Sequence, residues 1–359
     1  MYKGILTILL CLFVQLFSVY GQKDSIFFEE EDLSIYNNVV SVPTKRYCTS
    51  KVSGLSPSKL ISFGFDYQGS STYTAGADKL NGFSDETAKN NFNYGTRFAA
   101  NLPFISNTKL LVNLGINWWS NNYSFENKAD LKNPFIKTLN NNGLRTTGAN
   151  LTVFKPFNEF WFTLAQCSFD FNGDFKTSQL PQLNQLKVSA TIIIGKKPID
   201  RRICGLGIAR TYRAGELSLF PILLYNYTFP NKKWGIEALL PAKANIRYAI
   251  NSRNLIFAGF ELEGNSYRLN NLMAENTSQL PAAYNALELR RSEFRPRITY
   301  EFSLYKFFWI SIQAGYRYNY KFNMDNGNFY RGADDKPYVT ANSFSNSFYT
   351  SFSLNLVSP

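Results

Sequence analysis

The sequence contains no histidine among its 359 residues, and its charged residues make up only 18%. The missing histidine excludes His-based catalytic triads, HExxH zinc sites and imidazole acid–base catalysis. The charged fraction lies below the roughly 25% of a typical soluble domain. Cysteine is also scarce. Apart from Cys11, only Cys48, Cys167 and Cys204 occur, and their wide spacing predicts small apolar side chains rather than disulfides or a metal site.

Long apolar runs are absent except at the N-terminus. Lys3 precedes an apolar stretch of about 15 residues, and small side chains near Gly21 follow it. This pattern predicts a signal peptide over residues 1–21, cleaved near Gly21/Gln22. Cys11 follows Leu10 inside the stretch, which does not fit a lipoprotein signal. No later stretch approaches 18 continuous apolar residues, so we expect no membrane-spanning helix.

Aromatic residues are abundant, at 16%, and many of them alternate with small or polar residues. In the run 307–321, Ile310, Ile312 and Ala314 alternate with Ser311, Gln313 and Gly315. Such runs extend over about 10–14 residues, as long as a tilted transmembrane strand requires. An apolar face with aromatic ends predicts strands that face lipid on one side and a lumen on the other.

The predicted strands number about 14, an even number as single-chain barrels of this type have. They cover 59–68, 91–103, 108–121, 143–155, 159–171, 184–195, 202–212, 216–228, 233–240, 243–250, 254–263, 289–304, 307–321 and 343–357. Because Pro221 and Pro241 interrupt the stretch 216–263, a count of 12 is the alternative. We therefore expect an all-β fold, a transmembrane antiparallel up-and-down β-barrel over residues 58–359.

The connections between these strands alternate in length. Every long connection has an odd position in the order, and every even one is short. Long extracellular loops and short periplasmic turns produce this alternation when both termini are periplasmic. The segment 22–57 precedes the barrel and carries the acidic run 29–32. Two interpretations stay open for it, a solvated periplasmic lead-in and a plug packed in the lumen.

No residue pattern indicates an active site. The stretch 205–210 begins like a GxGxxG loop but lacks the third glycine, so glycines of an alternating strand are the better interpretation. Loop carboxylates such as Asp78, Asp325 and Asp334 fit Asx-rich turns better than a calcium site. We expect no catalytic residues, no cofactor and no metal.

Charged residues within the strands are the remaining functional clue. The predicted register points ten of them into the lumen: Arg97, Lys187, Arg247, Arg297, Arg317, Lys321, Asp66, Asp170, Glu261 and Glu301. The basic residues could focus an electric field on anions that pass through a channel. Equally, they could pair with the acids across strands and fill a closed barrel.

The leader and the outward apolar faces predict the outer membrane of a Gram-negative bacterium. The expected partners are outer-membrane lipid and lipopolysaccharide, with the barrel-assembly machinery during biogenesis. A monomer is favoured. The net charge of +12 raises the possibility of nucleic-acid binding, but a membrane barrel does not fit that role.

The stretch from Phe220 to Tyr267 resembles an uncharacterised outer-membrane β-barrel family. It contains Trp234-Gly235-Ile236-Glu237, then Leu240-Pro241, and later Gly259-Phe260-Glu261-Leu262-Glu263-Gly264. The family is one of the domain-of-unknown-function families of Gram-negative Bacteroidota. The resemblance implies an outer-membrane barrel and supplies no functional residues.

These observations predict an outer-membrane barrel that acts either as a small passive, porin-like pore for polar or anionic solutes or as a structural or binding barrel. One alternative is a soluble secreted β-sandwich that binds glycans through its aromatic residues. The other is an outer-membrane enzyme that works without histidine.

Overall fold

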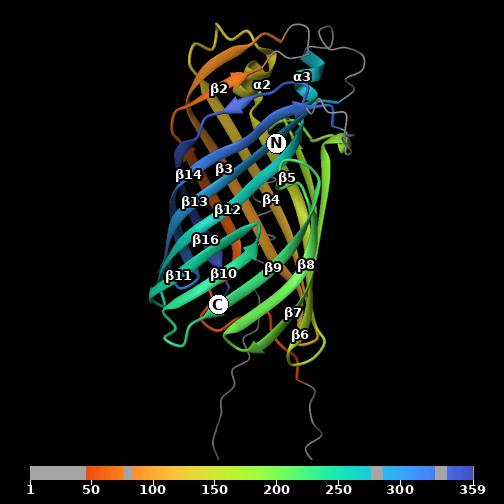
Figure 1. Cartoon of the computed structure of the whole chain (residues 1–359). Coiled ribbons are helices and arrows are strands. Elements are labelled where there is room, and N and C mark those ends of the chain that lie inside the picture. Colours follow the sequence, from red (N-terminus) through yellow and green to blue (C-terminus); the bar gives the residue numbers. More distant parts are fainter. Residues whose placement is uncertain (1–45, 77–82, 276–285, 328–337, 359) are drawn as a thin grey trace, which may run out of the picture. The chain divides into compact units, whose positions relative to one another are not determined.

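The computed structural model describes residues 46–76, 83–275, 286–327 and 338–358 (Figure 1). The predicted signal peptide and the acidic run 29–32 lie outside the described residues, as do Asp78 and Asp334. None of the described helices is long and apolar enough to cross a membrane.

Fourteen antiparallel strands form the wall of a closed barrel, each paired with its neighbours in chain order. They are β1 (Lys59–Gln68), β3 (Glu86–Asn107), β4 (Leu110–Phe125), β5 (Leu144–Pro156), β6 (Trp161–Gly173), β7 (Leu186–Ile199), β8 (Arg202–Thr211), β9 (Ser218–Thr228), β10 (Trp234–Leu240), β11 (Lys243–Asn251), β12 (Asn254–Arg268), β13 (Glu288–Tyr305), β14 (Phe308–Asp325) and β16 (Ser347–Val357). The barrel closes because β1 pairs with both β16 and β3. The predicted up-and-down barrel is confirmed, with 14 strands rather than 12.

Two short strands extend the sheet beyond the wall. β2 (Ser71–Ala75) continues from β1 along β3, and β15 (Ser343–Phe344) pairs with β2. The connections alternate as the sequence predicts. Six connections of two to five residues lie at one end of the barrel, where β1 begins and β16 ends. The seven connections at the other end include the long ones, which carry α2 (Pro134–Asn142), η2 (Leu183–Gln185) and α3 (Asn270–Glu275).

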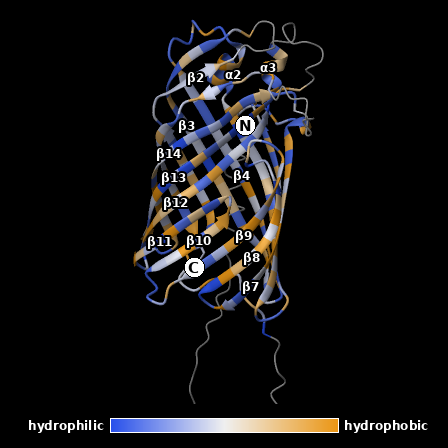
Figure 2. Cartoon of the chain, viewed as in Figure 1, coloured by the Kyte–Doolittle hydropathy of each residue, from blue (hydrophilic) through white to orange (hydrophobic). Residues whose placement is uncertain are grey.

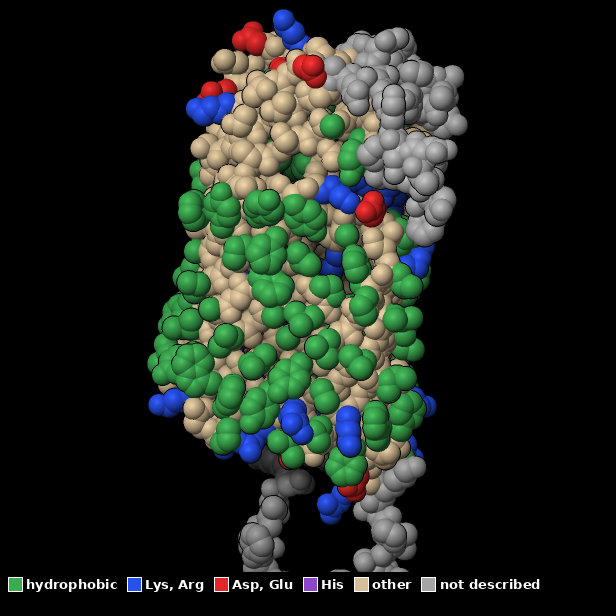
Figure 3. All heavy atoms as spheres, in the orientation of Figure 1, with side chains coloured by type: hydrophobic (Ala, Val, Ile, Leu, Met, Phe, Trp, Pro, Cys, Tyr) green, Lys and Arg blue, Asp and Glu red, His purple; other side chains and the backbone are tan. Residues whose placement is uncertain are grey.

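Alternate residues of each wall strand face outward, and the outward ones are largely apolar. On β8, Leu206 and Ile208 are 70% and 53% exposed, whereas Ala209 is 3% exposed. Figure 2 shows the hydrophobic and hydrophilic residues alternating along the strands, and Figure 3 shows the resulting apolar covering of the wall. Since an outward apolar surface of this kind suits lipid rather than water, the barrel is of the transmembrane type.

An apolar core closes the end of the barrel that carries the long connections. Asn133 caps α2, where its side chain accepts a hydrogen bond from the Phe135 N–H, and Gly143 ends the helix at φ +67°. The buried face of α2 then packs against apolar residues of β2, β4, β13 and β14. This cluster includes Phe135, Ile136, Leu139, Tyr73, Phe125, Leu289 and Phe322.

The two sides of the barrel also meet directly at this end. Arg268 of β12 forms a parallel bridge with Gly173 of β6, although five strands separate β12 from β6 in the sheet. The next residue, Asp174, accepts hydrogen bonds from the backbone N–H groups of Asn271 and Leu272 in α3. Burial raises the pKa of the Asp174 carboxyl group above its ordinary value, while the hydrogen bonds from the α3 backbone act in the opposite direction.

Residues 46–57 pack inside the opposite end, among the short turns. Cys48 and Val52 belong to an apolar cluster with Phe154, Phe162 and Ile203, whose side chains are all buried. The backbone of this segment also bonds to two of the turns, from Cys48 N–H to the Asn158 carbonyl at 2.9 Å and from Ser53 N–H to the Asp200 carbonyl at 2.8 Å. This part of the segment before the barrel is therefore fixed to the short-turn end.

Candidate functional site

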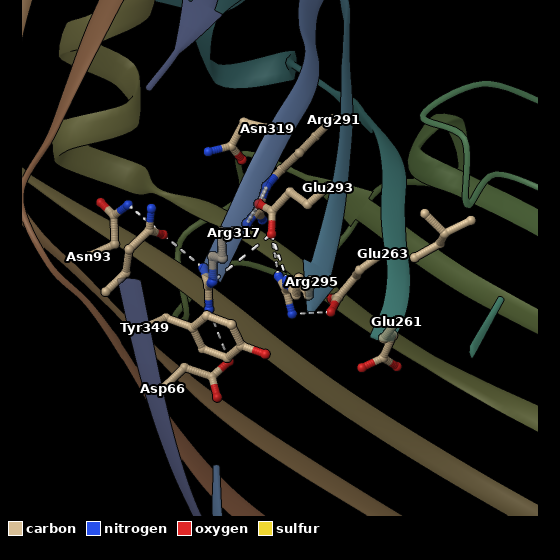
Figure 4. A network of polar contacts seen from close by, with 12 residues as sticks. Asp66, Asn93, Glu261, Glu263, Arg291, Glu293, Arg295, Arg317, Asn319 and Tyr349 are labelled. Atoms are coloured by element: carbon tan, nitrogen blue, oxygen red, sulfur yellow. Dashed lines mark hydrogen bonds and ion pairs between the residues drawn. The ribbon is translucent and has the colours of Figure 1, made fainter. Parts of the chain in front are cut away.

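A network of ion pairs occupies the interior of the barrel and centres on Glu293 of β13 (Figure 4). The Glu293 carboxylate accepts hydrogen bonds from the Nε atoms of Arg291 and Arg295, both at 2.7 Å. Arg317 of β14 approaches the same carboxylate at 4.0 Å. All four side chains are buried, with at most 4% of any residue exposed. One carboxylate thus lies among three guanidinium groups.

Asp66 of β1 is the second anionic centre of this network. Its carboxylate lies 2.6 Å from Arg97 Nε and 3.6 Å from Arg317. Arg317 also donates to Gln68, at 2.9 Å, and its guanidinium lies over the ring of Tyr349 at 4.8 Å. Arg317 therefore links the two carboxylates, both of which are buried, whereas the Arg97 side chain is 34% exposed.

The network reaches across the lumen rather than along one strand pair. Arg97 of β3 lies 3.5 Å from Glu263 of β12, and four wall strands separate β3 from β12. Glu263 also pairs with Arg295. The indole ring of Trp119 on β4 lies beneath Arg97, Arg291 and Arg295, at 4.6 to 5.6 Å from their guanidinium carbons. Side chains from both sides of the barrel thus meet at one level of its interior, beside cavities of about 440 and 460 Å³ that Arg97 also lines.

The ten charged residues singled out from the sequence occupy several environments. Asp66, Arg97 and Arg317 belong to the network described above. Arg297 pairs with Glu261, Lys187 with Glu288, Arg247 with Glu237 at 3.1 Å, and Glu301 with Lys59 at 2.6 Å. Asp170 accepts a hydrogen bond from Asn117 at 3.1 Å.

Lys321 lies beyond a register shift between β13 and β14. Ser292 is paired with Lys321 and the adjacent Glu293 with Asn319, so one extra residue is accommodated on β14. Since a bulge reverses the alternation of a strand, Phe322 enters the apolar core at the long-connection end. Lys321 instead pairs with Glu216 of the connection between β8 and β9, at 2.9 Å.

The sequence reasoning missed the centre of the network. Glu263, Arg291, Glu293 and Arg295 were not among the residues expected to face the lumen. The signal was present, because Arg291, Glu293, Arg295 and Arg297 alternate with uncharged residues at every second position of β13. Four charged residues on one face of a strand, opposite an apolar face, indicate an inward-facing ionic ladder.

A chamber of about 510 Å³ lies beside the network, under strands β6 to β10. Its inner wall is apolar and is formed by Leu164, Ile193, Ala209, Ile222 and Leu239. Its edge is charged and carries Arg213, Lys243 and Glu261. A volume of this size, lined mainly by apolar groups with a few polar ones at one side, is typical of small-molecule sites.

Nothing in the described part of the chain suggests metal or thiol chemistry. The described residues contain no group of three or more carboxylate or cysteine side chains placed to hold a metal ion. Cys48, Cys167 and Cys204 are free thiols. The interior of the barrel therefore presents charged, amide and apolar side chains as its chemical groups.

No curated protein matches this chain. Similar solved structures include an outer membrane channel from Pseudomonas putida F1, at 11% identity and a TM-score of 0.34, covering 84% of this chain and 96% of that one. The Pseudomonas putida toluene transporter TodX is 9% identical with a TM-score of 0.32, covering 87% and 95%. The NanC porin is 9% identical with a TM-score of 0.33, covering 81% and 98%.

A family model matches the chain over residues 58–357, which includes every strand of the barrel wall. The model also covers the stretch from Phe220 to Tyr267 that resembles an uncharacterised barrel family. The chain belongs to the family described as domain of unknown function DUF6268.

Proposed function

We propose that this protein is a binding barrel of the outer membrane, and that it holds a small ligand in its interior rather than conducting solutes through an open axial pore. The observation that carries this proposal is the obstruction of the barrel axis at three levels. The apolar core around α2 closes one end, the network around Glu293 crosses the middle from wall to wall, and residues 46–57 pack into the other end.

The pairing of the interior charges supports the same conclusion. A channel that selects anions needs basic side chains whose charge is available to the solute. Here Arg97, Arg247, Arg295, Arg297 and Arg317 each lie within 4.0 Å of a carboxylate. Opposite charges at this separation cancel most of the field that would attract an anion. The paired, filled interior is therefore the better of the two interpretations that the sequence leaves open.

The cellular setting is part of the proposal. The apolar wall supports contact with outer-membrane lipid and lipopolysaccharide, and the N-terminal pattern supports export with cleavage near Gly21/Gln22 and delivery to the barrel-assembly machinery. The position of the short turns supports periplasmic termini. The resemblance around Trp234 supports an origin in Gram-negative Bacteroidota. We propose a monomer without enzymatic activity, because the absence of histidine excludes the catalytic groups that such barrels would most readily use.

Conductance across a planar bilayer tests the proposal. The purified full-length protein is inserted into the bilayer, and a shift in gel mobility on heating verifies that the barrel is folded. We expect no steady ionic current from the wild-type protein. A stable open-channel current in most insertions would contradict the proposal and favour the passive pore.

A deletion variant indicates which obstruction matters. Removal of residues 46–57 opens the short-turn end but leaves the network and the apolar core in place. We expect this variant to stay non-conducting or to show only brief current flickers. A steady current after this deletion would mean that the segment alone closes a pore, and the binding barrel would lose its main support.

A further inference from the structure

The wall of the barrel has a gap between β9 and β12. β10 pairs with β9 only as far as Leu240 opposite Leu223, and β11 pairs with β12 only as far as Lys243 opposite Glu261. The two-residue turn 241–242 joins β10 and β11 at this height. Above the turn, residues 218–222 of β9 and 262–268 of β12 have no wall strand between them within the part of the chain that the structure describes.

The connection 212–217 bounds this gap on the other side. Arg213 Nη1 donates to the Leu262 carbonyl at 3.3 Å, and Glu216 pairs with Lys321 at 2.9 Å. The connection lies so close to β12 that a Cβ atom on Gly264 would stand 2.3 Å from the Arg213 carbonyl oxygen. The gap is therefore an opening bounded by the turn 241–242 at one edge and by the connection 212–217 at the other. The contacts with Leu262 and Lys321 hold this connection in place.

The 510 Å³ chamber lies directly behind this opening. Its lining includes Phe220 and Ile222 of β9 and Pro241 and Ala242 of the turn, and it also includes Leu262 and Tyr320. Leu262 alternates with the inward-facing Glu261 and Glu263, and Tyr320 is 45% exposed on the outside of β14. The cavity thus continues from the interior to the outer face of the wall.

The surroundings of the opening are apolar on the outside. Leu219 and Leu206 are 69% and 70% exposed close to it. Figure 3 shows this face of the barrel, with basic side chains recessed among the apolar ones of the covering. An apolar molecule that dissolves in the lipid around the barrel would meet this surface first, since its transfer there costs no exposure to water.

The electrostatics of the chamber edge favour an anion. Glu261 is neutralised by its pair with Arg297. Lys243 is exposed to the chamber and has neither a hydrogen-bond nor an ion-pair partner among the described residues. Arg213 donates to the uncharged backbone carbonyl of Leu262 and has no carboxylate within 4.0 Å among the described residues. Lys243 stands opposite Glu261 in the pairing of β11 with β12, and Arg213 also interacts with this carboxylate. Together with Arg297, three cations share one acid at the chamber edge, and this excess of positive charge attracts negative charge.

We propose that this chamber is a binding site for an amphipathic monoanion, a carboxylate with an apolar body, whose head lies between Lys243 and Arg213. The apolar body would pack against Ile193, Ile222 and Leu239. These side chains carry no polar group, so the contact would leave no hydrogen-bonding group unsatisfied. This proposal rests on the proposed function of a ligand-binding barrel and specifies its ligand class and its opening through the wall.

Calorimetric titration of the full-length protein in lipid nanodiscs tests the proposal. The probes are octanoate, 1-octanol and octylammonium, which share one apolar chain and differ in the charge of the head. Heats from protein-free nanodiscs are subtracted. We expect octanoate to bind more tightly than octanol, and octylammonium to bind most weakly.

Two variants and one matched control locate the site. Lys243→Gln should weaken octanoate binding by about tenfold to a hundredfold, because a charge-assisted hydrogen bond is lost, and should leave octanol unchanged. Ala209→Phe fills the chamber and should abolish the binding of both. Ile208→Phe adds an aromatic ring to the outer face of the same strand, where the native side chain is 53% exposed, and should bind octanoate like the wild type.

Several results would overturn the proposal: no octanoate binding above empty nanodiscs, equal binding of all three probes, or binding that survives Ala209→Phe. If Ala209→Phe does not give the folded gel mobility, Lys243→Gln alone decides, because it only replaces an exposed side chain. Conductance of the wild-type protein is measured separately. If the wild-type barrel does not conduct and does not bind octanoate, only this site is refuted. If the wild-type barrel conducts, the proposed function is refuted.

Discussion

Replacement of Glu293 by glutamine should destabilise the barrel strongly. Glu293 is 1% exposed and is the carboxylate that Arg291 and Arg295 both contact. In the network, the carboxylates of Asp66, Glu263 and Glu293 face the guanidinium groups of Arg97, Arg291, Arg295 and Arg317. The glutamine would leave two acids against four bases and so raise the excess positive charge from one to two.

The magnitude follows from the burial of these groups. Removal of one partner from a buried ion pair costs about 3–5 kcal/mol, because the remaining charge has lost its water and its counter-ion together. We therefore expect Glu293→Gln to lower the free energy of unfolding by about that amount. Among the described residues, Arg291 forms an ion pair with Glu293 alone, so adding Arg291→Met should recover part of the loss, with a coupling of about 0.5–3 kcal/mol.

Equilibrium unfolding in urea, with the barrel in lipid vesicles, measures these changes by tryptophan fluorescence. The matched control is Glu126→Gln, because Glu126 forms an ion pair with Lys89 in which the two side chains are 39% and 60% exposed. An exposed pair contributes at most about 1 kcal/mol, so this variant should resemble the wild type. If Glu293→Gln changes the free energy of unfolding no more than Glu126→Gln does, the network does not stabilise the barrel and the reasoning is wrong.

Two further predictions concern a buried carboxyl group and the topology of the barrel. Burial raises the pKa of the Asp174 carboxyl group, so the folded state binds its proton more tightly than the unfolded state. The free energy of unfolding should therefore fall as the pH rises from the ordinary pKa towards the raised one. Asp174→Asn should remove this slope, measured by urea unfolding between pH 4 and pH 7. For the topology, a cysteine that replaces Lys128, in the connection that carries α2, should react with an impermeant maleimide on intact cells. A cysteine that replaces Asn231, in a short turn, should not react. The reverse pattern would place both termini outside the cell.

The wall of the barrel could be read from the sequence because its determinants are local. Alternation of apolar and polar residues has a period of two, and that period is visible in any single strand. Even the short strands of 216–263, which Pro221 and Pro241 interrupt, are present as β9 to β12. Pro221 faces outward on β9, and Pro241 stands in the turn between β10 and β11.

The pairing inside the barrel could be read only in part. The inward positions of Arg97 and Asp66 follow from alternation. The contact of Arg97 with Glu263 does not follow, because four wall strands separate β3 from β12. Lys321 shows a second limit. The bulge opposite Glu293 reverses the alternation just before it, and no residue type in the run 307–321 marks that position.

By itself, then, the sequence determined the class of the fold and the alternation of short and long connections, and it left the number of strands between 14 and 12. These depend on periodicity and turn residues, which neighbouring positions specify. Only the tertiary structure decided that paired charges cross the interior, that the number of wall strands is 14, that residues 46–57 pack into one end, and that a chamber opens through the wall between β9 and β12. Those features arise where distant strands meet around a closed circle, and the distances between them depend on the closure of the whole barrel.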